Sequence, residues 1–232
     1  MPYSIVTFDV GGTLMSMDRE QVANEYVSLA RGCGAVVDLA SARAMFAALD
    51  DEIPKRARQS LPLSLDDRAG EAFWRTLFAD GWARLGLEPD AACVDKLYRQ
   101  FRLGGFNRMF EDVRPAMQAL QARGLRLGVL SNFTKDCQAI LRALGIGEYF
   151  SFFAVSAFVR AEKPDRALFE YAIHAAQKPA GAILHVGDSP HSDVEGAQAA
   201  GMAAILLDRD NWYPDYAAVP RIRKLTELLE LL

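Results

Sequence analysis

The chain has 232 residues, of which 51% are hydrophobic, so it is long enough for one large globular domain or for a core domain that carries a smaller one. Its 26 basic and 30 acidic side chains give a formal net charge of −4, which excludes a global field that would attract nucleic acid or anionic lipid. The three cysteines lack the spacing of a zinc site or a disulfide framework, and the sequence contains neither a secretory leader pattern nor an apolar run of bilayer length. We therefore expect a cytoplasmic protein that acts on a small molecule, with no nucleic-acid or membrane partner.

The first predicted element is a strand over residues 4–8, because its sequence, SIVTF, is rich in β-branched and aromatic residues. The strand ends at Asp9, and the stretch FDVGGTLM then turns through Gly11 and Gly12 to a threonine. In an open α/β sheet, ligands bind beyond the carboxyl ends of the strands. We therefore expect Asp9 to face a ligand, and backbone amides at the two glycines to approach a phosphate without a Cβ in the way.

Residues 16–108 interrupt this pattern, because they contain no convincing strand and show four amphipathic helical patterns, at about 18–31, 38–58, 65–85 and 89–102. A connection that follows a strand normally has only a few residues. The segment is therefore predicted to be an inserted helical subdomain, with residues 1–15 and 109–232 forming the core domain. Because the insertion leaves from the end of the first strand, it is expected to cover the ligand crevice as a cap.

From residue 113 onward, helical and strand patterns alternate. The predicted helices cover residues 113–124, 135–145, 165–177, about 191–200 and 224–232. The predicted strands cover residues 125–131, 182–188 and 202–208, and a short apolar segment covers residues 150–156. This alternation predicts an α/β fold with a doubly wound parallel sheet.

Polar residues follow the predicted strands at four places: Asp9, Ser131 with Asn132, Lys163, and Asp188 with Asp193. A carboxylate such as Asp9 can attack phosphorus and form an aspartyl-phosphate if a cation offsets the repulsion between the two anions. Mg²⁺ prefers oxygen ligands from one or two carboxylates, which Asp9, the Gly11 carbonyl and Asp188 could supply. The Ser131 hydroxyl and the Lys163 ammonium group would bind the remaining phosphoryl oxygens.

Most of these residues also have an ordinary structural explanation, and Asp9, which precedes two glycines, could cap a turn. Ser131 and Asn132 could cap the helix that follows them. Lys163 could be a solvated loop lysine, and Asp193 could stabilise the first turn of a helix. His191 is left out of the predicted site, because a single histidine in a polar loop is usually solvated. The coincidence of four such stretches in one fold favours a catalytic or ligand-binding site.

In order and spacing, these stretches resemble the four motifs of the haloacid dehalogenase superfamily, in its branch with a helical cap. The residues that match are Asp9, Gly12, Thr13 and Leu14 in the first motif, Ser131 in the second, Lys163 in the third, and Gly187, Asp188 and Asp193 in the fourth. The resemblance implies a Rossmann-like core and a Mg²⁺-dependent phosphatase that acts through an aspartyl-phosphate at Asp9. It further implies phosphate contacts from Gly12, Ser131, Asn132 and Lys163, and a metal site formed by Asp9, Gly11, Asp188 and, indirectly, Asp193.

The chain departs from the family pattern at Gly11, where phosphatases of this superfamily carry a second aspartate. In those enzymes the second aspartate protonates the leaving group and then activates water. Weak or altered hydrolysis of a small phosphorylated metabolite is therefore expected, and a protein that binds phosphorylated ligands without catalysis is the alternative. A 2-haloacid dehalogenase is disfavoured, because the family's dehalogenases need no metal and lack the GDxxxxD pattern found here.

Overall fold

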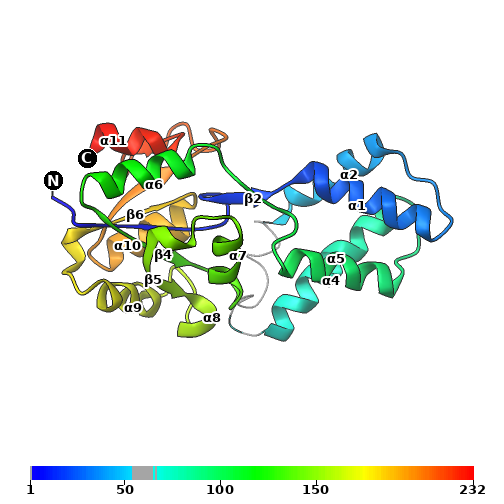
Figure 1. The fold of residues 1–232 in the computed structure, drawn as a ribbon, viewed down its shortest axis with the longest axis horizontal. Coiled ribbons are helices and arrows are strands. Elements are labelled where there is room, and N and C mark those ends of the chain that lie inside the picture. Colours follow the sequence, from blue (N-terminus) through cyan, green and yellow to red (C-terminus); the bar gives the residue numbers. More distant parts are fainter. Residues whose placement is uncertain (1, 54–64, 66) are drawn as a thin grey trace. The chain divides into compact units, whose positions relative to one another are not determined.

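The computed structural model describes residues 2–53, 65 and 67–232. The chain divides into two compact units (Figure 1). The core unit contains Met1–Ser16 and Met109–Leu232, and the helical unit contains Met17–Arg108. Residues 54–58, the end of the helix predicted over 38–58, lie outside the described residues. That the helical unit acts as a cap stays a prediction.

The core unit is built on a six-stranded sheet in which every pair of neighbouring strands is parallel. Its strands, in their order across the sheet, are β5 (Phe150–Val155), β4 (Arg126–Ser131), β1 (Ile5–Phe8), β6 (Ile183–Gly187), β7 (Ala203–Leu207) and β8 (Arg221–Ile222). The chain order reverses at β1, which lies between β4 and β6. In a doubly wound sheet the ligand crevice opens beyond the strand ends at this reversal. The predicted α/β fold class is confirmed, and Asp9 follows the strand at the reversal.

Helices and short turns connect these strands. The helices are α6 (Val113–Ala122), α7 (Cys137–Ala143), α8 (Ser156–Val159), α9 (Arg166–Ala176), α10 (Gly196–Ala199) and α11 (Leu228–Leu231). Three 3₁₀ turns cover Gly147–Tyr149, Ala180–Ala182 and Leu225–Glu227, and one π-helical turn covers Pro190–Glu195. The predicted helix near 191–200 is therefore a π-helical turn followed by α10, and the helix predicted over 224–232 is a 3₁₀ turn followed by α11.

The two faces of the sheet carry separate apolar cores, because side chains alternate between the faces of a strand. Val6 and Phe8 of β1 belong to a buried cluster with residues of α6 and α7. Ile5 belongs to a second cluster with Leu168 and Phe169 of α9. Thr7 is also fully buried and, by alternation, shares the face of Ile5.

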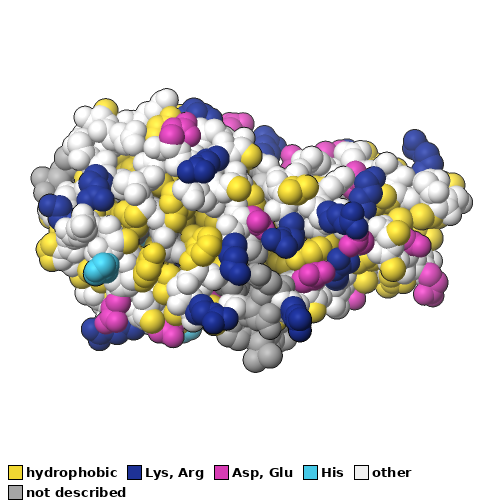
Figure 2. All heavy atoms as spheres, turned by 60° about the horizontal axis from the view of Figure 1, so that its bottom comes forward, with side chains coloured by type: hydrophobic (Ala, Val, Ile, Leu, Met, Phe, Trp, Pro, Cys, Tyr) yellow, Lys and Arg dark blue, Asp and Glu magenta, His cyan; other side chains and the backbone are white. Residues whose placement is uncertain are grey.

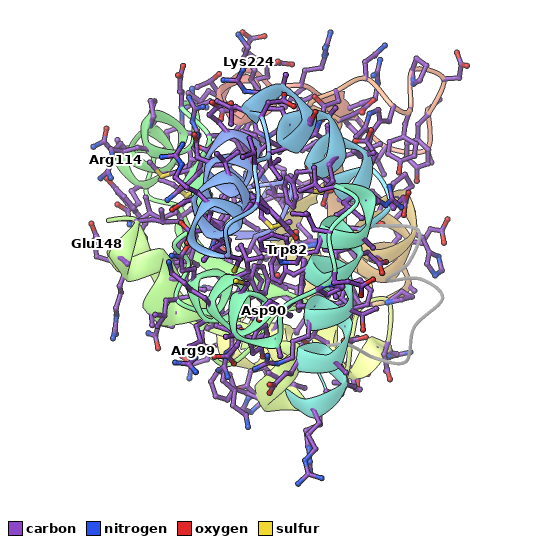
Figure 3. The ribbon with its side chains drawn as sticks, turned by 90° about the vertical axis from the view of Figure 1, so that its right-hand side faces the viewer. Trp82, Asp90, Arg99, Arg114, Glu148 and Lys224 are labelled. Carbon is purple, nitrogen blue, oxygen red and sulfur yellow. The ribbon has the colours of Figure 1, made fainter. Side chains whose placement is uncertain are left out.

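The helical unit contains α1 (Arg19–Gly32), α2 (Leu39–Asp50), α4 (Asp67–Arg84) and α5 (Ala91–Arg102). Aspartate side chains accept hydrogen bonds from backbone amides at the first turns of α1, α2 and α5, and these residues are Asp18, Asp38 and Asp90. The buried side chains of Phe78 and Trp82 belong to the core of this unit, and Figure 3 shows Trp82 among its helices. The reduced cysteines Cys33 and Cys93 also lie in this unit, with their Sγ atoms 3.3 Å apart.

The segments that join the two units pair with each other. β2 (Met15–Met17) and β3 (Asn107–Met109) form a two-stranded sheet. In the core unit, Arg209 donates to the Thr13 carbonyl at 2.8 Å and to both Asp112 carboxylate oxygens at 3.0 and 3.1 Å. The Arg209 guanidinium also lies 3.9 Å from the centre of the Phe110 ring. One arginine thus links the chain just before β2 to the chain just after β3.

On the face of the molecule in Figure 2, basic and acidic side chains are interspersed, in keeping with the small net charge of −4. None of the helices within the described residues has the combined length and apolar character that a membrane crossing requires.

Candidate active site

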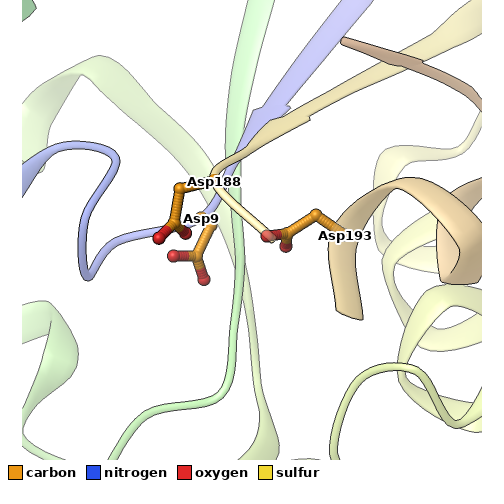
Figure 4. Close-up of side chains that lie close together, drawn as sticks. All are labelled: Asp9, Asp188 and Asp193. Atoms are coloured by element: carbon orange, nitrogen blue, oxygen red, sulfur yellow. The ribbon is translucent and has the colours of Figure 1, made fainter. Parts of the chain in front are cut away.

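Three carboxylates converge beyond the carboxyl ends of the central strands. Asp9 follows β1, Asp188 follows β6, and Asp193 lies in the π-helical turn (Figure 4). One oxygen atom of each carboxylate lies within 4.8 Å of the other two. The register of the sheet places Phe8 beside Val186, so the residues that follow these strands leave the sheet side by side. The topology, and not proximity in the sequence, therefore brings Asp9 to the other two aspartates.

Lys163 lies between two of these carboxylates. Its buried ammonium group donates to Asp9 Oδ1 and to Asp193 Oδ1, each at 2.5 Å. Because an ammonium group has three N–H donors, one donor remains beyond these two contacts. The Lys163 backbone is held by Asn132, whose Oδ1 accepts from the Lys163 N–H at 2.7 Å and whose Nδ2 donates to the Lys163 carbonyl at 3.0 Å. Lys163 is thus fixed at both ends.

The site carries an excess of negative charge. Desolvation raises the pKa of Asp188 well above its usual value, and repulsion from Asp9 and Asp193 raises it further. Desolvation also raises the pKa of Asp9, despite attraction by Lys163. For Asp193 the balance is reversed, because attraction by Lys163 and a hydrogen bond from His185 lower its pKa in spite of burial. For Lys163, attraction by the two carboxylates outweighs burial and raises the pKa.

The donor set and this charge balance both fit a divalent cation such as Mg²⁺. Carboxylate and carbonyl oxygens are the ligands that Mg²⁺ prefers in proteins. Burial raises the pKa values of Asp9 and Asp188, and repulsion among the carboxylates adds to the effect. A cation held by these oxygens would favour their ionised forms.

Ser131 and Asn132 have different surroundings. The Ser131 hydroxyl is buried and has no hydrogen-bond partner among the described residues. A buried polar atom normally has a partner, so this hydroxyl is suited to a ligand oxygen. The Asn132 side-chain amide is instead bonded to the backbone of Lys163. Neither residue caps α7, since that helix begins at Cys137, after Asp136.

The glycines around the site differ in how much space surrounds them. Gly12 has φ +73°, and a Cβ built on it would collide with the Asp188 carboxylate. A Cβ on Gly187 would likewise collide with the Asp193 carboxylate. A Cβ on Gly11 would meet no atom within 4 Å, and the φ of Gly11 lies outside the left-handed range. The site therefore requires glycine at positions 12 and 187 and leaves room for a side chain at position 11.

Sequence reasoning missed His185, which is fully buried in β6 and contacts Asp193. The available signal was a histidine in the otherwise apolar strand sequence ILHVG. The exposed His191 instead pairs with Glu195, with 2.8 Å between Nδ1 and Oε2.

The comparisons with known proteins agree with this architecture. The chain is 32% identical over 208 residues to haloacid dehalogenase-like hydrolase domain-containing protein 3 of Mus musculus, covering 88% of this chain and 81% of the relative. It is 32% identical over 163 residues to pyrimidine 5'-nucleotidase YjjG of Escherichia coli, covering 66% of this chain and 68% of the relative. In fold it resembles the HAD-hydrolase YfnB of Bacillus subtilis, solved bound to magnesium, with a TM-score of 0.74 and 24% identity over 100% of this chain and 99% of the other. The sequence profile of haloacid dehalogenase-like hydrolases matches residues 3–201, and the chain therefore belongs to this family of hydrolases.

Proposed function

We propose that the protein is a Mg²⁺-dependent phosphatase of small phosphorylated metabolites, with Asp9 as the nucleophile. The observation that carries the proposal is the position of the Asp9 carboxylate, next to Asp188 and hydrogen-bonded to the Lys163 ammonium group at 2.5 Å. The similarity to a pyrimidine 5'-nucleotidase supports a phosphate monoester as the substrate class.

In this mechanism an oxygen of Asp9 attacks phosphorus. A P–O bond forms to Asp9 as the bond from phosphorus to the leaving-group oxygen breaks, and water then cleaves the aspartyl-phosphate to inorganic phosphate and free Asp9. The Ser131 hydroxyl and the remaining N–H of Lys163 hold the phosphoryl oxygens. A Mg²⁺ ion held by Asp9, the Gly11 carbonyl and Asp188 would offset the repulsion between the carboxylate and the phosphoryl group. Asp193 supports this arrangement through Lys163, and Asn132 contributes by holding the Lys163 backbone.

Gly11 favours a second candidate function, a protein that binds phosphorylated ligands and turns them over slowly or not at all. The side chain that would protonate the leaving group in the related phosphatases is missing at this position. Binding of phosphate requires only the donors at Ser131 and Lys163, which the chain retains.

A turnover screen with Asp9→Asn as the matched control separates these functions. The substrates are aryl phosphates, acyl phosphates, pyrimidine 5'-nucleotides, alkyl phosphates and phosphonates, each with Mg²⁺ or with EDTA. We expect Mg²⁺-dependent phosphate release that Asp9→Asn abolishes, because the amide has a similar shape and cannot attack phosphorus. Equal turnover by the variant contradicts the nucleophile assignment. Phosphate binding by both proteins without turnover favours the binding function, and chloride release from 2-chloropropionate without Mg²⁺ favours dehalogenation.

A further inference from the structure

His185 is a polar residue in the middle of a buried strand, and the proposed chemistry gives it no role. In the register of the sheet it lies beside Thr7 of β1, and both residues are fully buried. The His185 ring meets the Phe169 ring of α9 edge-on, with 6.0 Å between the ring centres. An imidazole in such apolar surroundings is costly to bury unless its nitrogens have hydrogen-bond partners. The hydrogen-bond partners of the His185 ring therefore indicate what role this residue has.

Both ring nitrogens of His185 are engaged. Nε2 lies 3.0 Å from Asp193 Oδ1, and Nδ1 lies 3.0 Å from the Thr7 hydroxyl. The Asp193 carboxylate already accepts a hydrogen bond from the Lys163 ammonium group, and an ionised carboxylate has no proton to donate. The proton between His185 and Asp193 must therefore sit on Nε2. In the neutral ring, Nδ1 then carries no proton and can accept from the Thr7 hydroxyl, whose oxygen also lies 3.4 Å from the Leu184 carbonyl oxygen.

The Asp193 oxygen that His185 binds is the same oxygen that holds Lys163. Oδ1 of Asp193 accepts from both His185 and Lys163, while Oδ2 accepts from the Ser189 backbone N–H at 2.9 Å. The side chain thus has three donors that fix its rotation, and the one from His185 comes from the rigid centre of the sheet. Lys163 in turn reaches Asp9 Oδ1. A continuous chain of hydrogen bonds runs from Thr7 in the apolar core to the carboxylate at the carboxyl end of β1.

We propose that His185 is a positioning residue for the reaction, which fixes Asp193 so that Lys163 is held against Asp9. This inference rests on the proposed function for its kinetic consequences, although the arrangement itself can be tested without turnover. The competing explanation is that His185 only fills space in the core between β6 and α9. The two explanations differ in whether the Nε2–H donor matters or only the volume of the side chain.

Two substitutions separate the donor from the volume. In His185→Gln the side-chain amide nitrogen reaches the place of Nε2 and can still donate to Asp193. In His185→Asn the shorter amide ends near the place of Nδ1, so Asp193 loses its donor. The matched control is His174→Asn, an identical change at an exposed position of α9. Outer hydrogen-bond partners of this kind typically contribute about 10- to 100-fold to activity.

The kinetic experiment measures kcat and KM on an aryl phosphate with Mg²⁺, together with the Tm of each protein. We expect kcat of His185→Asn to fall about 10- to 100-fold with little change in KM, and His185→Gln to retain most of the wild-type kcat. Purely structural importance would instead make both variants lose activity in proportion to their loss of Tm. That result, or wild-type kcat in His185→Asn, overturns the inference.

An NMR experiment decides the point even if no phosphate ester is turned over. The chain has only 3 histidines, which makes the imidazole nitrogens easy to assign. We expect His185 to show a slowly exchanging proton on Nε2, and the buried Lys163 ammonium group to give a resolved ¹⁵Nζ signal that Lys163→Arg removes. This signal should persist in His185→Gln and be lost in His185→Asn. A proton found on Nδ1 alone, or a Lys163 signal that survives in both variants, refutes the positioning role, whereas wild-type turnover by Asp9→Asn refutes only the proposed function.

Discussion

Replacing Gly11 by aspartate should give the site the acid that it lacks. The structure allows the change, since a Cβ at position 11 meets no atom within 4 Å and the backbone there is outside the left-handed range. Apart from the repulsion that a further carboxylate adds to the site, the effect on the free energy of unfolding should stay within about 0.5 kcal/mol, because the change brings neither a clash nor backbone strain. Gly12, one residue further on, has no such freedom because a side chain there would collide with Asp188.

The expected effect of Gly11→Asp on catalysis is much larger than its effect on stability. A positioned general acid typically contributes about 10²–10⁴-fold, which corresponds to a lowering of the barrier by roughly 3–5 kcal/mol. The gain should appear with alkyl phosphates, because a poor leaving group depends most on being protonated. Aryl phosphates, whose leaving groups depart readily as anions, should gain little.

The assay is a series of phosphate esters of graded leaving-group pKa, with rate constants measured for wild type and for Gly11→Asp under the same Mg²⁺ concentration. The wild-type rates should fall steeply as the leaving-group pKa rises, and the variant should flatten that slope. Gly11→Asn, with the same shape and no acidic proton, is the control and should keep the wild-type slope. Wild-type protein that already cleaves alkyl phosphates as fast as aryl phosphates would refute the reasoning, as would a folded Gly11→Asp protein with an unchanged slope.

Two further changes test the electrostatics of the core unit. Asp188→Asn should weaken Mg²⁺ binding in a calorimetric titration and yet raise the Tm measured in EDTA. It removes a carboxylate whose pKa is raised by desolvation and by repulsion from Asp9. A lower Tm in EDTA would contradict this account. Asp208 should stabilise the loop after β7, since burial is outweighed by hydrogen bonds from the Tyr213 and Trp212 amides and from Arg221, which lower its pKa. That contribution is complete above the pKa of Asp208 in the unfolded chain, about 3.9, and is lost as the pH falls through the lower pKa of the folded protein. Asp208→Asn should therefore lower the free energy of unfolding, measured with urea, by about 1–3 kcal/mol at pH 7 and by progressively less in acid.

The parts of the fold that follow from local patterns were predictable from the sequence. The strand expected over residues 4–8 is β1, Ile5–Phe8, and the helix expected over residues 89–102 is α5, Ala91–Arg102. Their hydrophobic periods and capping residues lie within a few positions of each other, so the signal is local. The short strands β2, β3 and β8 were not predicted, because two or three residues are too few to show a hydrophobic period. These strands are defined only by their pairing in the folded chain.

The sequence allowed the residues of the candidate site to be predicted, but not the hydrogen bonds that connect them. The four sequence stretches identified the carboxylates that converge, since the carboxyl ends of parallel strands meet at one edge of the sheet. The use of the Asn132 amide on the backbone of Lys163, 31 residues away, depends on the path of two separate loops. His185 was missed for a similar reason, because its hydrogen-bond partners, Thr7 on β1 and Asp193 in the π-helical turn, are distant from the local strand pattern or separated from it by a loop.

The pairing of β2 with β3 has a consequence for how this chain can diversify. Neighbouring strands lie about 5 Å apart, so the chain leaves the core unit through β2 and returns through β3 at nearly the same place. In its connection to the core, the helical unit is therefore equivalent to a loop that joins two adjacent strands. Doubling the length of a flexible loop costs only about 0.6 kcal/mol of closure entropy. Arg209, through the Thr13 carbonyl and Asp112, holds both ends of that loop from within the core. An insertion of different length or composition can thus be accommodated at this point of the chain, while the aspartates at the carboxyl ends of β1 and β6 keep their register.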